Sequence, residues 1–151
     1  YDVDGEIFGL EQNPANLIPI VMKTACGMRK EMSVFGDDYD TPDGTCIRDY
    51  VHVTDLADAH VKALEYISKN NKNLKLNLGS EVGTSVKEVI DIARKITGKP
   101  IYAKIEKRRP GDTAVLYTTS KRALEILGWK AQYSDMETII KTTLNAYLKN
   151  C

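Results

Sequence analysis

Apolar residues recur every three to four positions in five segments of this chain, which is the spacing of an amphipathic helix. The first segment runs from Leu17 to Met28, and either Asn13 or Asn16 can cap its first turn. Pro19 fits this helix because it lies near the beginning, where a backbone N–H has no helical acceptor. The other four predicted helices cover residues 56–67, 86–96, 121–127 and 135–148.

Polar residues that cap helices precede these segments, and glycines follow two of them. Ser85 with Glu88 forms a capping box before the third helix, and Gly98 with Pro100 ends that helix. Gly128 ends the fourth helix in the same way. The other predicted caps are Thr54 with Asp55, Ser120, and Ser134 with Glu137.

Short runs of β-branched, aromatic or alternating residues separate the helices and predict strands. Residues 74–78 alternate strictly between leucine and polar side chains, as a half-buried strand does. Thr41-Pro-Asp-Gly44 has the composition of a tight turn. Because strands and helices alternate, the sequence predicts one domain with an α/β fold of some α+β character. The predicted strands are 32–35, 46–53, 74–78, 101–106 and 114–118.

Composition narrows the class of protein. The 151 residues contain 21 Lys and Arg and 21 Asp and Glu, and this balance argues against a nucleic-acid binder. The longest apolar run, 17–22, is far shorter than a membrane span. Cys26, Cys46 and Cys151 form no Cys-x-x-Cys pair, which argues against a disulfide framework or a zinc site. We expect a cytoplasmic protein without membrane or nucleic-acid partners, and the start at Tyr1 is typical of an excised piece.

Residues with obvious catalytic chemistry are few. His52 and His60 lie in different predicted elements without a metal-binding pattern, so a structural role is favoured for both. The sequence contains no G-x-S-x-G, P-loop or G-x-G-x-x-G motif. Tyr117 and Lys121 have the Tyr-x-x-x-Lys spacing, but a helix that begins after Ser120 would not carry both. We therefore assign no catalytic residue and no metal ligand.

Three arginines indicate a binding function more clearly than the histidines do. Arg48 lies inside an apolar segment, where its guanidinium must pair with Asp49 or another carboxylate, or face a cavity. Arg108 and Arg109 precede a Pro-Gly turn and Asp112. Such a loop is either a solvated surface or a rigid mount for guanidinium groups that bind phosphate through two hydrogen bonds. The pattern indicates an anion-binding surface.

A long, ordered set of motifs between Asp2 and Tyr147 resembles the C-terminal half of the UDP-glucose 4-epimerase family, which belongs to the extended short-chain dehydrogenase/reductases. A set of this length is more specific than any one motif. Its members are Asp4-Gly-Glu6, Asn16-Leu-Ile-Pro19, Val34-Phe-Gly36, Tyr39-Asp-Thr-Pro-Asp-Gly-Thr45, Arg48-Asp-Tyr-Val-His-Val53, Asp55-Leu-Ala-Asp-Ala-His60, Asn77-Leu-Gly79, Ser85-Val86, Gly98-Lys99, Arg109-Pro-Gly-Asp112 and Leu127-Gly-Trp129.

The resemblance implies that residues 1–151 are a UDP-sugar-binding C-terminal domain. NAD, the catalytic Ser/Thr and the Tyr-x-x-x-Lys pair would then belong to an N-terminal Rossmann domain that this chain lacks. In that family NAD takes hydride from C4 of the sugar and returns it to the other face of a 4-keto intermediate, which interconverts UDP-glucose and UDP-galactose. The resemblance further implies a homodimer, and it implies that residues 55–67 and 74–78 pack on the NAD domain.

The same resemblance implies eight substrate-binding residues: Asn16, Leu17, Ser33, Val34, Phe35, Arg48, Arg109 and Asp112. The first two correspond to helix-start positions that contact the UDP-sugar, and the next three to a strand that presents its backbone to uracil. The two arginines correspond to diphosphate ligands, and the aspartate faces the uridine ribose. Some relatives carry a tyrosine four residues after that aspartate, where this chain has Leu116.

Two alternatives remain open at this level. Another UDP-sugar enzyme of the same family, such as a UDP-glucuronate decarboxylase or an epimerase of N-acetylated sugars, shares much of the pattern, although residues 43–53 favour the glucose/galactose enzyme. A stand-alone nucleotide-sugar-binding module without catalysis is the other. A Gly-rich βαβ unit upstream in the gene would decide for the enzyme.

Overall fold

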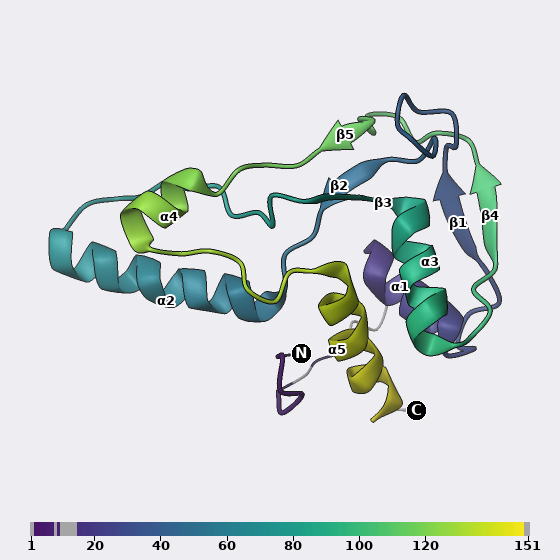
Figure 1. Ribbon diagram of the computed structural model, residues 1–151, viewed down its shortest axis with the longest axis horizontal. Helices are drawn as coiled ribbons and strands as arrows, with labels where there is room; N and C mark the ends of the chain where they lie inside the picture. Colours follow the sequence, from purple (N-terminus) through teal and green to yellow (C-terminus); the bar gives the residue numbers. More distant parts are fainter. Residues whose placement is uncertain (1, 8, 10–14, 150–151) are drawn as a thin grey trace.

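The structure is a computed structural model that describes residues 2–7, 9 and 15–149. A lobe of three helices and a strand pair lies at one end, and an arm built on the longest helix extends from it (Figure 1). The elements in chain order are α1 (Leu17–Ala25), β1 (Met32–Phe35), β2 (Ile47–Asp49), α2 (Val53–Asn70), β3 (Gly83–Ser85), α3 (Val86–Thr97), β4 (Ala103–Glu106), β5 (Val115–Leu116), α4 (Lys121–Leu127) and α5 (Met136–Leu148).

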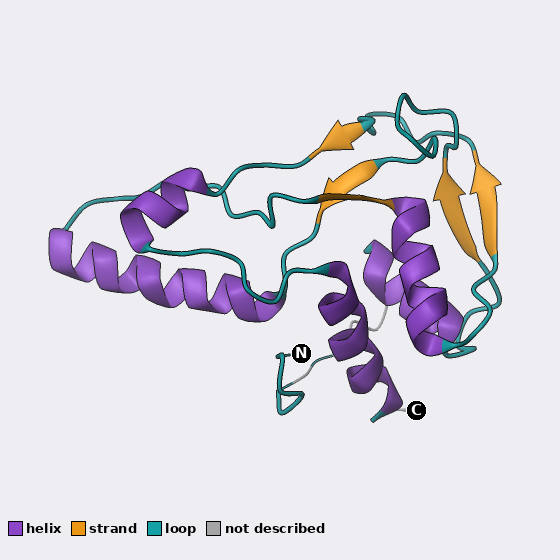
Figure 2. Cartoon of the chain, in the orientation of Figure 1, coloured by secondary structure: helices purple, strands orange, loops and turns teal. Residues whose placement is uncertain are grey.

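Two small sheets accompany the helices, and loops form much of the chain between them (Figure 2). β1 pairs in parallel with β4, while β2 lies between antiparallel β3 and parallel β5. Helices and strands mix as the predicted α/β fold with α+β character requires, so that prediction is confirmed. None of the helices within the described ranges combines the length and the apolar character needed to cross a bilayer.

The hydrophobic core of the lobe lies where α1, α3 and α5 meet. Val21, Val89 and Ile140, one from each helix, are completely buried there. Met32 and Ile101 extend the same core to the β1–β4 pair. The helical periodicity read from the sequence therefore marks the faces that pack, because burying these apolar stripes removes them from water.

Helix α3 has the predicted termini. Ser85 Oγ accepts from the Glu88 N–H at 3.1 Å, and the Glu88 carboxylate accepts from the Ser85 N–H at 2.7 Å. Gly98 ends the helix in the left-handed conformation, with φ of +63°. Helix α1 begins after Asn16 as predicted, although the Asn16 side chain makes no capping bond; the alternative cap, Asn13, lies outside the described residues.

The predicted start of α2 was wrong. The helix begins at Val53, and His52 caps it, because His52 Nδ1 accepts from the Thr54 N–H at 3.1 Å. Thr54 and Asp55 lie in the first turn instead of before it. Asp55 is buried, and its carboxylate accepts from the N–H groups of Gln132 and Tyr133, both at 3.0 Å. Partners 77 and 78 residues away thus take the side chain that the sequence assigned to a cap.

The predicted cap of α5 was wrong for the same reason, whereas Ser120 is the residue before α4 as predicted but makes no capping bond. Ser134 donates to Asp55 Oδ2 at 2.5 Å, so Asp135 caps α5 by accepting from the Thr138 N–H at 2.9 Å. Ser120 precedes α4, but its hydroxyl bonds to the N–H and the carbonyl of Gly79. In each case a long-range partner competes for the hydroxyl more effectively than the nearby helix terminus.

Strand lengths also differ from the predictions. The predicted strand 46–53 pairs only over Ile47–Asp49, and residues 83–85, which were not among the predicted strands, form β3 against it. Residues 74–78 alternate between half-buried and exposed positions as predicted, yet they pair with no strand within the described part of the chain. Strand assignment depends on a partner, which the periodicity of one segment does not supply. β4 and β5 lie within their predicted ranges but are shorter.

The arm consists of α2, α4 and the residues 74–78 that lie against them. Trp129 is completely buried at its base and donates from Nε1 to the Asp55 carbonyl at 2.9 Å. Ala59 and Ala123 pack against this indole. On α2, in contrast, the large apolar side chains Val61, Leu64 and Ile67 are exposed.

Candidate functional site

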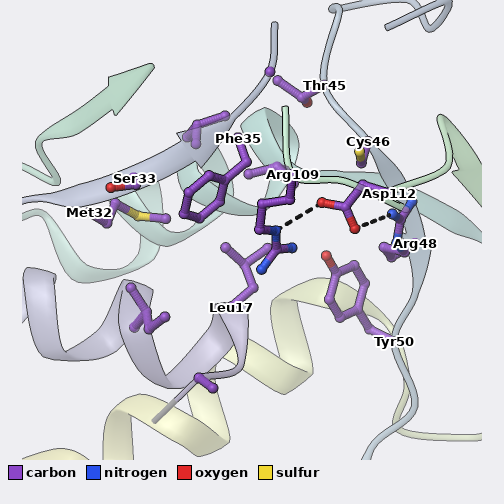
Figure 3. A pocket seen from close by; sticks show the side chains of 15 residues that line it. Leu17, Met32, Ser33, Phe35, Thr45, Cys46, Arg48, Tyr50, Arg109 and Asp112 are labelled. Carbon is purple, nitrogen blue, oxygen red and sulfur yellow. Dashed lines mark hydrogen bonds and ion pairs between the residues drawn. The ribbon is translucent and has the colours of Figure 1, made fainter. Parts of the chain in front are cut away.

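A pocket opens between the start of α1, strands β1 and β2, and the loop 107–113 (Figure 3). Of the eight residues implied by the resemblance, all except Asn16 line it. Asn16 is an exposed residue at the start of α1, between two residues that do line the pocket. The lining residues are Ala15, Leu17, Ile20, Met32, Ser33, Val34, Phe35, Gly36, Thr45, Cys46, Arg48, Tyr50, Val86, Arg109 and Asp112.

One carboxylate lies between two guanidiniums at the polar end of the pocket. Arg109 Nε donates to Asp112 Oδ2 at 2.9 Å, and Arg48 Nη2 lies 3.5 Å from Asp112 Oδ1 (Figure 3). Arg48 Nη1 also donates to the carbonyl of Thr113 at 2.8 Å, which fixes the group against the loop. The three side chains carry a net charge of +1, so this end of the pocket attracts an anion.

The partner of Arg48 is therefore Asp112 and not the neighbouring Asp49. Asp49 accepts instead from the Ser80 N–H at 2.9 Å and the Thr118 N–H at 3.2 Å. A Cβ at Gly79 would lie 2.3 Å from the Asp49 carboxylate, so this glycine allows close packing within the protein.

The aromatic ring of Phe35 forms the apolar wall beside this polar end. The Arg109 guanidinium lies 4.7 Å from the centre of the Phe35 ring. The Met32 N–H donates to the Tyr102 carbonyl at 2.9 Å, and the Gly36 N–H donates to the Glu106 carbonyl at 2.8 Å, so both N–H groups face β4. Because alternate residues of a strand direct their backbone groups to opposite edges, Ser33 and Phe35 direct theirs away from β4. The pocket thus combines an aromatic ring, backbone groups directed away from β4 and an anion site.

Tyr50 is a pocket residue that the sequence analysis missed. Its hydroxyl points toward the Arg109–Asp112 pair in Figure 3. Burial raises the pKa of the Tyr50 phenol to about 12, so the group stays protonated and can donate a hydrogen bond. The available signal was its spacing: residues i and i+2 of an extended segment share a face, which places Tyr50 on the side of Arg48.

The remaining candidates are structural. His52 is buried, and its Nε2 lies 3.0 Å from Thr142 Oγ1. His60 bonds through Nδ1 to the carbonyl of Leu56 at 2.7 Å within α2. Tyr117 precedes α4, whereas Lys121 is its first residue, so the pair does not share a helix face, as predicted. Among the described residues, no three His, Cys, Asp or Glu side chains are grouped closely enough to hold a metal ion.

Comparison with known proteins assigns the chain to a family. The family profile described as GDP-mannose 4,6 dehydratase matches residues 7–143. The chain belongs to this family. Curated proteins that resemble it include the UDP-glucose 4-epimerase of Halalkalibacterium halodurans, which is 48% identical over 145 residues, and that of Lacticaseibacillus casei, which is 46% identical over 143 residues. These alignments cover 95% and 94% of this chain, and 43% of each relative.

Solved structures of UDP-glucose 4-epimerases also resemble this chain over most of its length. The UDP-glucose 4-epimerase from Brucella ovis in complex with NAD is 45% identical, with a TM-score of 0.90 over 95% of this chain and 44% of its own. The enzyme from Bifidobacterium longum in complex with NAD⁺ and UDP is also 45% identical, with a TM-score of 0.83 over 94% of this chain and 41% of its own. The chain therefore spans less than half the length of the family members it matches.

Proposed function

We propose that this chain is the UDP-sugar-binding, C-terminal part of a UDP-glucose 4-epimerase. The observation that carries the proposal is the pair of guanidiniums, Arg48 and Arg109, held by one carboxylate at the end of a pocket with an aromatic wall. The similarity to UDP-glucose 4-epimerases over nearly the whole chain supports it. The substrates would be UDP-glucose and UDP-galactose.

Each part of UDP matches one part of the pocket. The two guanidiniums would bind the diphosphate through charge-assisted hydrogen bonds, and the Tyr50 hydroxyl, which points toward that end, would add a donor. Uracil would lie beside Phe35 and pair with the backbone groups of Ser33 and Phe35. Asp112 would accept from the ribose hydroxyls, and residues Asn16 and Leu17 at the start of α1 would contact the sugar nucleotide.

NAD would bind outside these 151 residues. The sequence has no G-x-G-x-x-G turn, and the described strands form only a two-stranded and a three-stranded sheet. A dinucleotide site needs a parallel sheet with helices on both faces and a Gly-rich turn at a helix N-terminus, so the residues present do not fit this cofactor. The chain's own contribution would be to hold UDP while the chemistry takes place on the hexose.

The exposed apolar face of the arm suits this arrangement. Val61, Leu64 and Ile67 on α2 and the unpaired extended residues 74–78 would pack on the NAD-binding domain of the complete protein. That protein would be a cytoplasmic homodimer. The family resemblance supports both the contact with the NAD-binding domain and the homodimer.

The test is an activity assay of the complete protein that carries this chain. It should interconvert UDP-glucose and UDP-galactose, and calorimetry should detect UDP binding. UDP-N-acetylglucosamine and UDP-glucuronate are assayed in parallel, since the pocket would contact the UDP that all these ligands share. Turnover of only one of these two would show another enzyme of the family. UDP binding without any turnover would show a non-catalytic module, and absence of UDP binding would refute the proposal.

A further inference from the structure

Two consecutive arginines of the loop 107–113 point in different directions. Arg109 lines the pocket, whereas Arg108 crosses to the turn that follows β1. There Arg108 Nε donates to Asp38 Oδ1 at 2.7 Å, and Nη2 donates to the Asp38 carbonyl. The Arg108 guanidinium also lies 4.1 Å from the centre of the Tyr39 ring, which is the geometry of a cation–π contact.

Tyr39 and Arg108 are closely packed against a residue of the pocket wall. Gly36 lines the pocket and has a φ of +86°. A Cβ on Gly36 would lie 2.5 Å from Tyr39 Cε2 and 2.7 Å from Arg108 Cγ, so the three residues leave no free space. Tyr39 is 6% exposed. A shift of Arg108 would therefore disturb the wall beside Phe35.

The loop is thus attached to the β1 side twice by adjacent residues. Arg108 stacks on Tyr39 outside the pocket, and Arg109 stacks on Phe35 inside it. The intervening backbone is short, so fixing the first guanidinium restricts where the second can lie. A guanidinium that is held in place before the ligand arrives loses less conformational entropy when it binds.

We propose that Arg108 is a positioning residue: by stacking on Tyr39 and pairing with Asp38, it holds the loop so that Arg109 is already oriented toward the diphosphate. Arg108 is not among the residues that line the pocket, so it acts through Arg109. This inference rests on the proposed UDP-binding function.

The experiment uses the complete protein that carries this chain and measures the dissociation constants of UDP and of uridine by calorimetry. The variants are Arg108→Ala, Arg108→Lys, Asp38→Asn, Arg109→Ala and the double variant Arg108→Ala with Arg109→Ala. Melting temperatures without ligand are recorded for all of them. Uridine lacks the diphosphate, so it reports on the rest of the pocket.

Arg94→Ala is a closely matched control. Arg94 is as exposed as Arg108, at 46%, and pairs with Asp91 at 2.9 Å. It also donates to one backbone carbonyl, that of Ile101. It lies on α3 outside the pocket, so its removal deletes the same kinds of bond without touching the loop.

Arg108→Ala should weaken UDP binding about fivefold and uridine binding less than about twofold, because the loss concerns Arg109 and not the uracil end. Arg108→Lys should be intermediate, since lysine keeps the ion pair but loses the planar stack. Arg94→Ala should leave both affinities unchanged. The double variant should bind UDP as Arg109→Ala alone does, because Arg108 has no effect without the group it positions.

The result that overturns the inference is equal UDP affinity of Arg108→Ala and Arg94→Ala. Additive losses in the double variant would also overturn it, because they would show that Arg108 acts independently of Arg109. If Arg108→Ala does not fold, Arg108→Lys and Asp38→Asn decide, and unchanged UDP affinity in both rejects the role. Failure of the unaltered protein to bind UDP would refute the proposed function instead.

Discussion

Asp112 is shared by two guanidiniums, and this sharing defines the pocket at the scale of single residues. The two partners differ in setting: Arg48 is 24% exposed and bonded to the loop backbone, whereas Arg109 is 58% exposed and stacks on Phe35. Arg48 is therefore fixed by bonds to the backbone, whereas Arg109 is held mainly by the Asp112 carboxylate and the Phe35 ring. Both remain able to offer N–H groups to an anion.

Replacing either arginine by alanine should weaken UDP binding in the complete protein. Loss of one charge-assisted pair removes about 1.5 to 3 kcal/mol, which is roughly a 10-fold to 150-fold change in dissociation constant. Lysine at Arg48 or Arg109 keeps the charge but not the planar fork, so its effect should be intermediate. Calorimetry with UDP and a melting curve without ligand measure both properties of all four variants.

An unchanged dissociation constant in both alanine variants would contradict the assignment. A large fall in melting temperature with little change in UDP affinity would show instead that the ion pairs with Asp112 serve stability. Arg94→Ala again provides the control for the loss of an arginine on the surface.

At the scale of elements, the start of α2 depends on a buried histidine. His52 Nδ1 must be unprotonated to accept from the Thr54 N–H. Burial lowers the pKa of His52, and the negative charge of Asp55 opposes this shift only in part. The folded state therefore binds fewer protons on this side chain than the unfolded state does at pH values below the usual histidine pKa.

The stability of the protein should consequently fall as the pH decreases below about 6.5, the pKa of an unperturbed histidine. The sign follows from linkage: a proton taken up only by the unfolded chain favours unfolding. His52→Asn keeps a capping side chain without a titrating group, so the decline between pH 7.5 and 5.0 should become shallower. Melting temperatures across that range measure the slope, and the exposed His60→Asn is the control.

Equal slopes for the protein with His52 and for His52→Asn would reject the histidine as the cause. His60 lies on the surface of α2, so its replacement should leave the slope unchanged.

At the scale of the whole molecule, the arm presents apolar side chains that the lobe does not cover. Val61 and Leu64 are 57% and 66% exposed on one helix. The isolated 151 residues should self-associate through this face, because contiguous apolar surface is stabilised by removal from water. Val61→Lys with Leu64→Lys should shift the isolated chain toward monomer in sedimentation experiments.

In the complete protein the same double change should lower the melting temperature, because it would weaken the proposed contact with an NAD-binding domain. Leu148→Lys is the control, because Leu148 is 61% exposed but lies at the end of α5, away from the arm. A monomeric isolated chain that is indifferent to both changes would contradict this expectation.

The isolated 151 residues should also lack epimerase activity. They contain no Gly-rich dinucleotide turn, and the Tyr117–Lys121 pair does not lie on one helix. Without a hydride acceptor and a positioned acid–base group, the reaction has no route on this chain. A coupled assay for UDP-glucose formation on the purified chain tests this, and turnover without contaminating complete protein would contradict it.

The sequence by itself determined the features that depend on neighbours within a few residues. The capping box of Ser85 and Glu88, the stop at Gly98 and the turn at Gly44, whose φ is +80°, all formed as predicted. Their partners lie three or four positions away, so composition and spacing suffice. The ordered motifs likewise indicated the relatives that the chain resembles.

Only the tertiary structure decided which distant groups meet. Asp112 reaches Arg48 across 64 positions, Ser134 leaves its predicted capping role to bond Asp55 across 79, and β3 forms only because β2 lies beside it. Each side chain or backbone group involved could form hydrogen bonds with several neighbours along the chain. Burial against a distant segment selects the partner that it has in the fold. Hydrophobic periodicity describes one segment of the chain, whereas a pocket is formed by several segments that meet only in the folded protein.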